Sequence, residues 1–276
     1  MTPPTARLRR VDATDLAFAG AAEQARLLAA GAISAPGLLE LYLDRIARLD
    51  RELRSFRIVM TEDARREAAA AQRRLDAGER LPLLGVPVAI KDDSDVAGEF
   101  TCYGSSAYDL EVTADSEVVH RLRQAGAVIL GKTSVPEMML WPFTETVSFG
   151  ATHNPWDVTH TPGGSSGGSG AAVAAGLAPL ALGSDGAGSI RIPASWCGLY
   201  GLKPQRGRVP IAAGEDPWNG LSVNGPLSRT VEDAALFLDV THDGQAPRGG
   251  FVEAAARAPG RLRIAFSTKL PPTMIA

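Results

Sequence analysis

Residues 163–194 read GGSSGGSGAAVAAGLAPLALGSDGAGSIRIPA, and glycine, serine and alanine fill most of this stretch up to Ile190. Ordering so many small residues costs conformational entropy, so the fold must require a close approach of the backbone here. A flexible linker is the alternative, but the strand-like run 180–182 and the flanking residues 190–193 argue against it. We therefore predict a folded segment, with a helix over 170–175 and a strand over 180–182.

Helix and strand patterns alternate along the rest of the chain. Residues 84–90 are apolar and valine-rich, which is typical of a buried strand, and they end at Lys91. Ser34 is a favoured N-cap residue, and Thr230 with Asp233 forms a capping-box pattern. The alternation predicts an α/β architecture in which helices cover a central sheet. Further helices are predicted over 61–78, 116–125 and 230–239, and further strands over 127–130 and 261–266.

The composition is that of an ordinary globular protein, with 276 residues of which 45% are hydrophobic and 21% charged. The net charge of −3 gives no electrostatic reason to expect nucleic acid or an anionic membrane as a partner. The two cysteines, Cys102 and Cys197, are too few for a disulfide framework and lack the spacing of metal ligands. We therefore predict no metal site.

The sequence also gives an expectation for localisation. No apolar run approaches the roughly 20 residues of a transmembrane helix. Residues 1–10 are basic, but charged residues interrupt 11–30, so this start does not form a signal-peptide core. We predict a cytoplasmic protein.

Two known motifs occur in the wrong context. Residues 126–133, GAVILGKT, match a phosphate-binding pattern, but their middle residues are the predicted strand, so their amides are committed to a sheet. Residues 163–167, GGSSG, match the nucleophile elbow of α/β hydrolases. An elbow needs a strand directly before the serine, whereas residues 156–162 have the pattern of a polar loop. The sequence disfavours both nucleotide binding and a serine–histidine–acid hydrolase.

Lysine is the base that this sequence offers to a hydroxyl nucleophile, because the chain has only four histidines. Burial and hydrogen bonding can lower a lysine pKa from about 10.4 to roughly 7–8, at a cost on the order of 4 kcal/mol. Lys91 closes an apolar strand, where such burial is expected. A solvated lysine beside Asp92 is the alternative. The lysines of the chain are Lys91, Lys132, Lys203 and Lys269.

Four motifs follow one another along the chain: GVPVAIKD at 85–92, GGSSGG at 163–168, GSIRIPA at 188–194 and CGLYGLKP at 197–204. In these motifs the chain resembles the amidase signature family, from about Asp15 to its end. The resemblance implies a mixed, largely parallel central sheet covered by helices. It also implies hydrolysis of a carboxamide C–N bond in a small-molecule amide substrate, without a cofactor, and it leaves a homodimer open.

The resemblance further implies the roles of three residues. Ser189 falls where the family has its nucleophile, Ser165 where it has a bridging cis-serine, and Lys91 where it has the general base. Neutral Lys91 would take a proton from Ser165, which takes one from Ser189, and Ser189 would attack the carbonyl carbon. An acyl-enzyme forms, the amine leaves, and water completes the cycle.

The residues around Ser189 agree with this role. Ser189 begins the segment 190–196, which could be a helix, so free amides and a positive dipole end lie near the nucleophile. The amides of Gly186, Ala187 and Gly188 are candidates for an oxyanion hole. Family members often have two glycines before the nucleophile, so Ala187 is a departure, because alanine resists positive φ.

Three neighbours are predicted to support the triad. Asp185 and Arg191 match family positions that look supportive and could pair with each other, with an ordinary surface ion pair as the alternative. Ser166 is predicted to be a hydrogen-bonding neighbour.

Residues 138–143, MMLWPF, lie where the family often builds its acyl pocket, although a core-packing stripe fits the pattern equally well. The candidate pocket residues are Met139, Trp141 and Phe143.

The organisation of the chain is predicted as a helical scaffold over residues 1–80 packed on a core over 81–276, together one structural domain. The chain is shorter than is usual for the family, so we expect the C-terminal part to be absent. Two alternatives stay open. One is the glutaminase component of a tRNA-dependent amidotransferase, which shares the triad. The other is a catalytically silent, truncated fragment that needs a partner chain.

Overall fold

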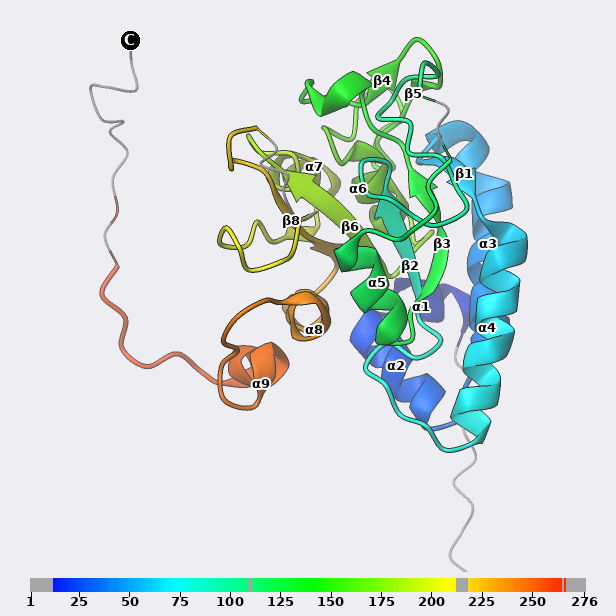
Figure 1. The fold of residues 1–276 in the computed structure, drawn as a ribbon, viewed down its shortest axis with the longest axis vertical. Coiled ribbons are helices and arrows are strands. Elements are labelled where there is room, and N and C mark those ends of the chain that lie inside the picture. The colour runs from blue at the N-terminus through cyan, green and yellow to red at the C-terminus, as the bar shows by residue number, and fades with distance from the viewer. Residues whose placement is uncertain (1–11, 109–110, 212–217, 265, 267–276) are drawn as a thin grey trace, which may run out of the picture.

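The computed structural model of the chain describes residues 12–108, 111–211, 218–264 and 266. In this part six strands form one sheet, in the order β1-β3-β2-β6-β8-β7 (Figure 1). β3, β2 and β6 run parallel in the centre, while the outer pairs are antiparallel. The predicted mixed α/β sheet with parallel central strands is confirmed. The strands are β1 (Phe56–Val59), β2 (Pro87–Lys91), β3 (Val128–Thr133), β6 (Leu180–Asp185), β7 (Tyr200–Gly201) and β8 (Val223–Ser228).

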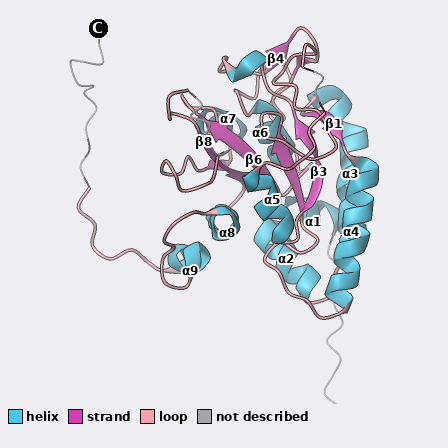
Figure 2. Cartoon of the chain, in the orientation of Figure 1, coloured by secondary structure: helices cyan, strands magenta, loops and turns pink. Residues whose placement is uncertain are grey.

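Helices cover the sheet and surround its ends (Figure 2). α3 and α4 pack against each other and α4 packs on β3, while α6 packs across β6, β2 and β3. α8 lies against β8 and also contacts α2 and α5. The helices are α1 (Ala13–Phe18), α2 (Ala21–Ala29), α3 (Ala35–Leu53), α4 (Thr61–Asp76), α5 (Glu117–Gln124), α6 (Gly167–Ala174), α7 (Arg191–Cys197), α8 (Val231–Thr241) and α9 (Gly250–Ala256). A 3₁₀ turn, Glu137–Met139, and a small ribbon, β4 (Glu145–Thr146) with β5 (Gly150–Ala151), complete the described elements.

The three central strands end at one edge of the sheet. Lys91 ends β2, where it pairs in register with Thr133 at the end of β3, and Asp185 ends β6. Every residue of these strands is buried, as expected for parallel strands covered on both faces. Ligand sites in α/β sheets form beyond the carboxyl ends of such strands. A functional site is therefore expected at this edge of the sheet.

Small residues bring α6 close to the sheet. A Cβ atom on Gly168 would overlap the backbone of Ser55 and Ser134, and one on Gly167 would overlap the side chain of Thr144. The predicted close approach of the backbone over 163–194 is confirmed. It explains why this stretch has so few large side chains.

The capping of α8 differs from the prediction in one respect. Thr230 Oγ1 accepts a hydrogen bond from Asp233 N at 3.1 Å, as the capping pattern predicts. The Asp233 carboxylate, however, accepts from Ala22 N at 2.9 Å instead of returning to its own N-cap. Gly20 leaves room for this contact, because a Cβ there would collide with that carboxylate. Asp233 thus ties α2 to α8.

The predicted strand over 261–266 is wrong for the residues described there, 261–264 and 266, which form no strand. A strand needs a hydrogen-bonded neighbour, and none of the described strands pairs with this segment. Leu262, Ile264 and Phe266 are exposed. Ala265 lies outside the described residues.

The division of the chain into residues 1–80 and 81–276 stays a prediction, and β1 lies inside the part predicted as helical. Among the described residues, no helix is both long enough and apolar enough to span a membrane. Residues 1–10, on which part of the localisation prediction rests, lie outside the described residues.

Candidate active site

Lys91, Ser165 and Ser189 come from three different segments that meet at the carboxyl edge of the central strands. Lys91 ends β2, Ser165 lies in the loop before α6, and Ser189 lies in the turn between β6 and α7. Lys91 Nζ is 2.8 Å from Ser165 Oγ, and both side chains are buried. The peptide bond between Gly164 and Ser165 is cis.

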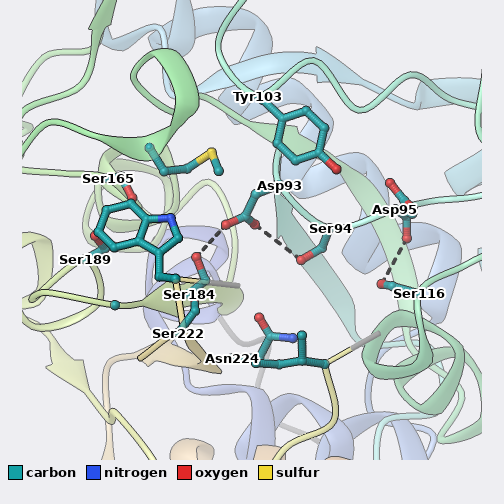
Figure 3. Close-up of a pocket in the computed structure, with 14 residues that line it drawn as sticks. Asp93, Ser94, Asp95, Tyr103, Ser116, Ser165, Ser184, Ser189, Ser222 and Asn224 are labelled. Carbon is teal, nitrogen blue, oxygen red and sulfur yellow. Dashed lines mark hydrogen bonds between the residues drawn. The ribbon is translucent and has the colours of Figure 1, made fainter. Parts of the chain in front are cut away.

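Both serines line one cavity of about 170 Å³ (Figure 3). Ser166 N donates a hydrogen bond to Ser189 O at 3.1 Å, and this contact holds the two serine-bearing loops together. Lys91 is not among the residues that line the cavity, and it has no solvent exposure. A substrate in the cavity would meet the serine hydroxyls and not the amine.

Lys91 is held by two residues outside the predicted site, Ser184 and Asp93. Its Nζ donates to Ser184 Oγ at 2.7 Å and lies 3.3 Å from Asp93 Oδ2. Burial lowers the pKa of Lys91 below its ordinary value, and the Asp93 charge opposes that shift. The amine is therefore placed to be neutral more readily than a lysine in water.

Asp185 organises the turn that carries Ser189. Its carboxylate accepts from Gly188 N at 2.7 Å and Ile190 N at 3.1 Å, and from the Arg191 guanidinium at 2.9 Å. Asp185 is fully buried and Arg191 is half-exposed, so the pair is not an ordinary surface ion pair. Burial acts to raise the pKa of Asp185, but the hydrogen bonds from Arg191, Gly188 and Ile190 outweigh it and lower that pKa. The carboxylate stays ionised and keeps the turn in place.

This turn changes the expected oxyanion hole. The Gly188 amide is engaged by Asp185, whereas the amides of Gly186 and Ala187 have no acceptor among the described residues. The left-handed residue of the turn is Gly188, with φ 122°. Alanine at 187 does not adopt a positive φ, so this departure from the two-glycine pattern causes no strain.

Ser166 and Ser169 anchor α6 beneath the site. Ser166 Oγ donates to Ser184 O at 3.2 Å, next to Lys91. Ser169 Oγ bonds Thr133 at 2.7 Å and Leu182 O at 2.9 Å, so it ties α6 to β3 and β6. Ser166 therefore lies beside Ser184 and Ser189, and Ser169 has a structural role.

The apolar wall of the cavity differs from the expectation. Met139 lines the cavity, but Trp141 and Phe143 are not among its lining residues. Their rings stack on each other with centroids 5.6 Å apart, and both side chains are exposed. Their backbone lies against Gly164. Trp218 lines the cavity instead, with its ring against Gly186. No periodic pattern in the sequence marks this residue.

The surroundings of Cys197 and Lys132 indicate structural roles for these two residues. Burial raises the pKa of the Cys197 thiol to about 12, which argues against a thiolate nucleophile there. Lys132 in β3 pairs through its Nζ with buried Asp92, just after β2, at 3.0 Å. Since residues 128–133 are strand, a phosphate-binding loop in this segment is excluded, as predicted.

The fold and the arrangement of this sheet edge define an α/β protein of the amidase signature type. The family model described as Amidase matches residues 37–275, so the chain belongs to this family, and the predicted resemblance is confirmed. "Putative amidase AmiB2" of Mycobacterium tuberculosis (strain ATCC 25618 / H37Rv) is 67% identical over 261 residues, which make up 95% of this chain and 56% of that relative. The chain spans about half the length of the curated relatives it matches.

Solved structures agree with the family. The structure of 6-aminohexanoate cyclic dimer hydrolase complexed with substrate matches with a TM-score of 0.82 and 38% identity, over 90% of this chain and 53% of that one. Native peptide amidase from Stenotrophomonas maltophilia matches with a TM-score of 0.76 and 37% identity, over 88% of this chain and 51% of that one.

Proposed function

We propose that the protein hydrolyses a carboxamide C–N bond in a small-molecule substrate, with Ser189 as nucleophile, Ser165 as proton relay and Lys91 as general base. The observation that carries the proposal is the 2.8 Å contact between buried Lys91 and buried Ser165, beside a cavity that Ser189 shares. Membership in the Amidase family supports it.

The proposed steps conserve protons throughout. Ser189 Oγ bonds to the carbonyl carbon while its proton passes to Ser165, and the Ser165 proton passes to neutral Lys91. The C–N bond then breaks, and the amine leaves with the proton returned from Lys91 through Ser165. Water repeats the same transfers to release the carboxylate and to restore Ser189.

The amides of Gly186 and Ala187 are proposed to stabilise the oxyanion, because the Gly188 amide is already held by Asp185. Donors of this kind each contribute about 3–4 kcal/mol in other acyl-transfer enzymes. Asp185 and Arg191 are proposed to hold the turn in its working geometry, and Ser166 to hold the two serine loops together.

The test is labelling with a fluorophosphonate, followed by intact mass. We expect one adduct on the parent chain, none on Ser189→Ala, and a rate lower by about 10²-fold or more on Lys91→Ala. Ser106→Ala, which removes an exposed hydroxyl bonded to Ser148, is the matched control and should label like the parent. An adduct that survives in Ser189→Ala would refute the assignment of the nucleophile.

The same reagent tests the silent-fragment alternative, which predicts a folded chain that takes up no label without a partner. The glutaminase alternative predicts that glutamine is hydrolysed in preference to simple aryl or alkyl amides. A panel of these amides, with released ammonia or amine as readout, separates the two substrate classes. Cytoplasmic location and a homodimer stay predictions.

A further inference from the structure

Asp93 lies two residues beyond Lys91 and lines the cavity beside Ser184 (Figure 3). Its Oδ2 accepts a hydrogen bond from Ser184 Oγ and lies 3.3 Å from Lys91 Nζ. Its Oδ1 is 3.3 Å from Ser94 Oγ. The side chain is 9% exposed, so water screens these contacts little.

When Lys91 is neutral, the hydrogen count at this corner has one consistent arrangement. An ionised carboxylate can only accept, so the single hydroxyl hydrogen of Ser184 is used on Asp93. Ser184 Oγ must then accept a hydrogen bond from Lys91 Nζ. The two other groups near Nζ, the Asp93 carboxylate and the Ser184 carbonyl at 3.4 Å, can also only accept. A neutral lysine has two hydrogens and one lone pair. Both hydrogens are taken on this side, and the lone pair is left for Ser165.

We propose that Asp93 is a positioning residue which, through Ser184, fixes the direction of proton transfer from Ser165 to Lys91. The inference rests on the proposed function, because it concerns the same base. Asp93 itself takes no proton. It sets a one-way chain in which Ser165 donates to Lys91, Lys91 to Ser184, and Ser184 to Asp93.

The charge of Asp93 has a second effect, on the ammonium that Lys91 becomes after the transfer. Burial lowers the pKa of Lys91, and Asp93 moves it back upward. Asp185, at the end of β6, acts in the same direction from farther away and is paired with Arg191. Asp92, the other neighbouring carboxylate, faces Arg57 and Lys132 instead. Asp93 is therefore the carboxylate that faces Lys91 directly.

The variant Asp93→Asn tests both effects, since it keeps the size, removes the charge and adds N–H donors that compete for the Ser184 and Lys91 acceptors. The rate of fluorophosphonate labelling is measured from about pH 5 to pH 10. We expect the plateau rate to fall about tenfold or more, because the relay loses its fixed direction. We expect the midpoint of the pH profile to move about one pH unit or more to lower pH, because the lysine loses a stabilising charge.

Ser184→Ala breaks the same chain while it keeps the carboxylate, and it covers the case in which Asp93→Asn does not fold. Its plateau rate should fall similarly, and the double variant should be no slower than the slower single variant, because the two residues act as one unit. Rates that multiply in the double variant would contradict the proposal.

Asp95→Asn is the matched control, since Asp95 lines the same cavity but accepts from Thr101 Oγ1 at 2.7 Å rather than facing Lys91. A midpoint shift as large as that of Asp93→Asn would overturn the proposal in favour of a general charge effect. Labelling of Asp93→Asn at the parent rate, with an unmoved midpoint, would also overturn it while leaving the proposed function standing. Labelling that persists in Ser189→Ala would instead refute the proposed function.

Discussion

Lys91 is an amine without solvent exposure, and its chemistry follows from that burial. Burial lowers its pKa from the ordinary 10.5, so the neutral form is reached at a lower pH than for a lysine in water. Because only the neutral amine can accept a proton, labelling of Ser189 should rise with pH by about tenfold per unit until that pKa is passed, and then level off. A profile that stays flat from acidic to alkaline pH would contradict lysine as the base.

Arginine should not replace Lys91. A guanidinium stays protonated at every working pH, so Lys91→Arg keeps a positive charge but cannot act as base. We expect its labelling rate to be as low as that of Lys91→Ala across the whole pH range. Recovery of the rate in Lys91→Arg would show that Lys91 acts by its charge alone.

Asp185 receives more hydrogen bonds than an amide could satisfy. Gly188 N donates to one carboxylate oxygen and Ile190 N to the other, and the Arg191 guanidinium donates to both. In Asp185→Asn one of these oxygens becomes an N–H donor, which would oppose one of the two backbone amides and one side of the guanidinium. We expect a loss of about 1–3 kcal/mol in the free energy of unfolding, measured by urea titration, and slower labelling of Ser189. Arg191→Gln should lower the free energy of unfolding by less, because Arg191 is the half-exposed member of the pair. Equal losses in the two variants would contradict this ranking.

The pH dependence of stability supplies a second check on Asp185. The pKa of Asp185 is lowered in the fold, so its contribution is present above the ordinary value of 3.8 and is lost as pH falls through the lowered value. Asp185→Asn should therefore lose less stability than the parent on acidification. A parallel loss in both proteins would place the acid-sensitive group elsewhere.

Sequence reasoning predicted the site residues that belong to motifs. It missed the site residues that are brought to the cavity only by the folding of distant segments. Lys91, Ser165 and Ser189 lie in recognisable motifs. Asp93 and Ser184 meet because β2 and β6 are parallel neighbours whose ends coincide, and no local pattern contains that pairing. Trp218 was not predicted as a cavity residue for the same reason, since it reaches the cavity from a distant loop.

The small residues of α6 allow this helix to approach neighbouring backbone closely. Gly168→Ala would place a Cβ in the backbone of Ser55 and Ser134, so either α6 or β3 would have to move. We expect a loss of about 1–3 kcal/mol in the free energy of unfolding and a slower Ser189, because α6 carries the Ser165 loop at its start. Gly260→Ala, where a Cβ meets nothing within 4 Å, is the control and should be near neutral. Equal stability of the two variants would show that the approach of α6 is not tight.

The helices and strands that were predicted correctly each have one strong local sequence pattern. The apolar runs of β2 and β3 and the cap of α3 at Ser34 indicated the right type of element in the right place. β1, β7 and β8 lie at or near the sheet edges, are short or contain glycine and proline, and become strands through pairing. Residues 261–264 and 266 show the converse, since alternating apolar residues without a partner do not make a strand.

Residues 262, 264 and 266 leave apolar side chains in solvent. Leu262, Ile264 and Phe266 are 62%, 82% and 87% exposed. Exposed apolar groups that follow one another along a segment favour association with another surface. We therefore expect this chain to self-associate as its concentration rises, as measured by light scattering.

The prediction is specific to that segment and can be tested there. The triple variant Leu262→Lys, Ile264→Lys, Phe266→Lys should shift association to higher concentration, because charged side chains lose hydration when surfaces meet. Val147→Lys is the matched control, since Val147 is 96% exposed but belongs to another loop, and it should associate like the parent. Association unchanged in the triple variant, or reduced equally by Val147→Lys, would mean that the chains meet through some other surface. If the triple variant also labels at Ser189 at the parent rate, the apolar segment and the sheet edge that carries Lys91 are independent features of the molecule.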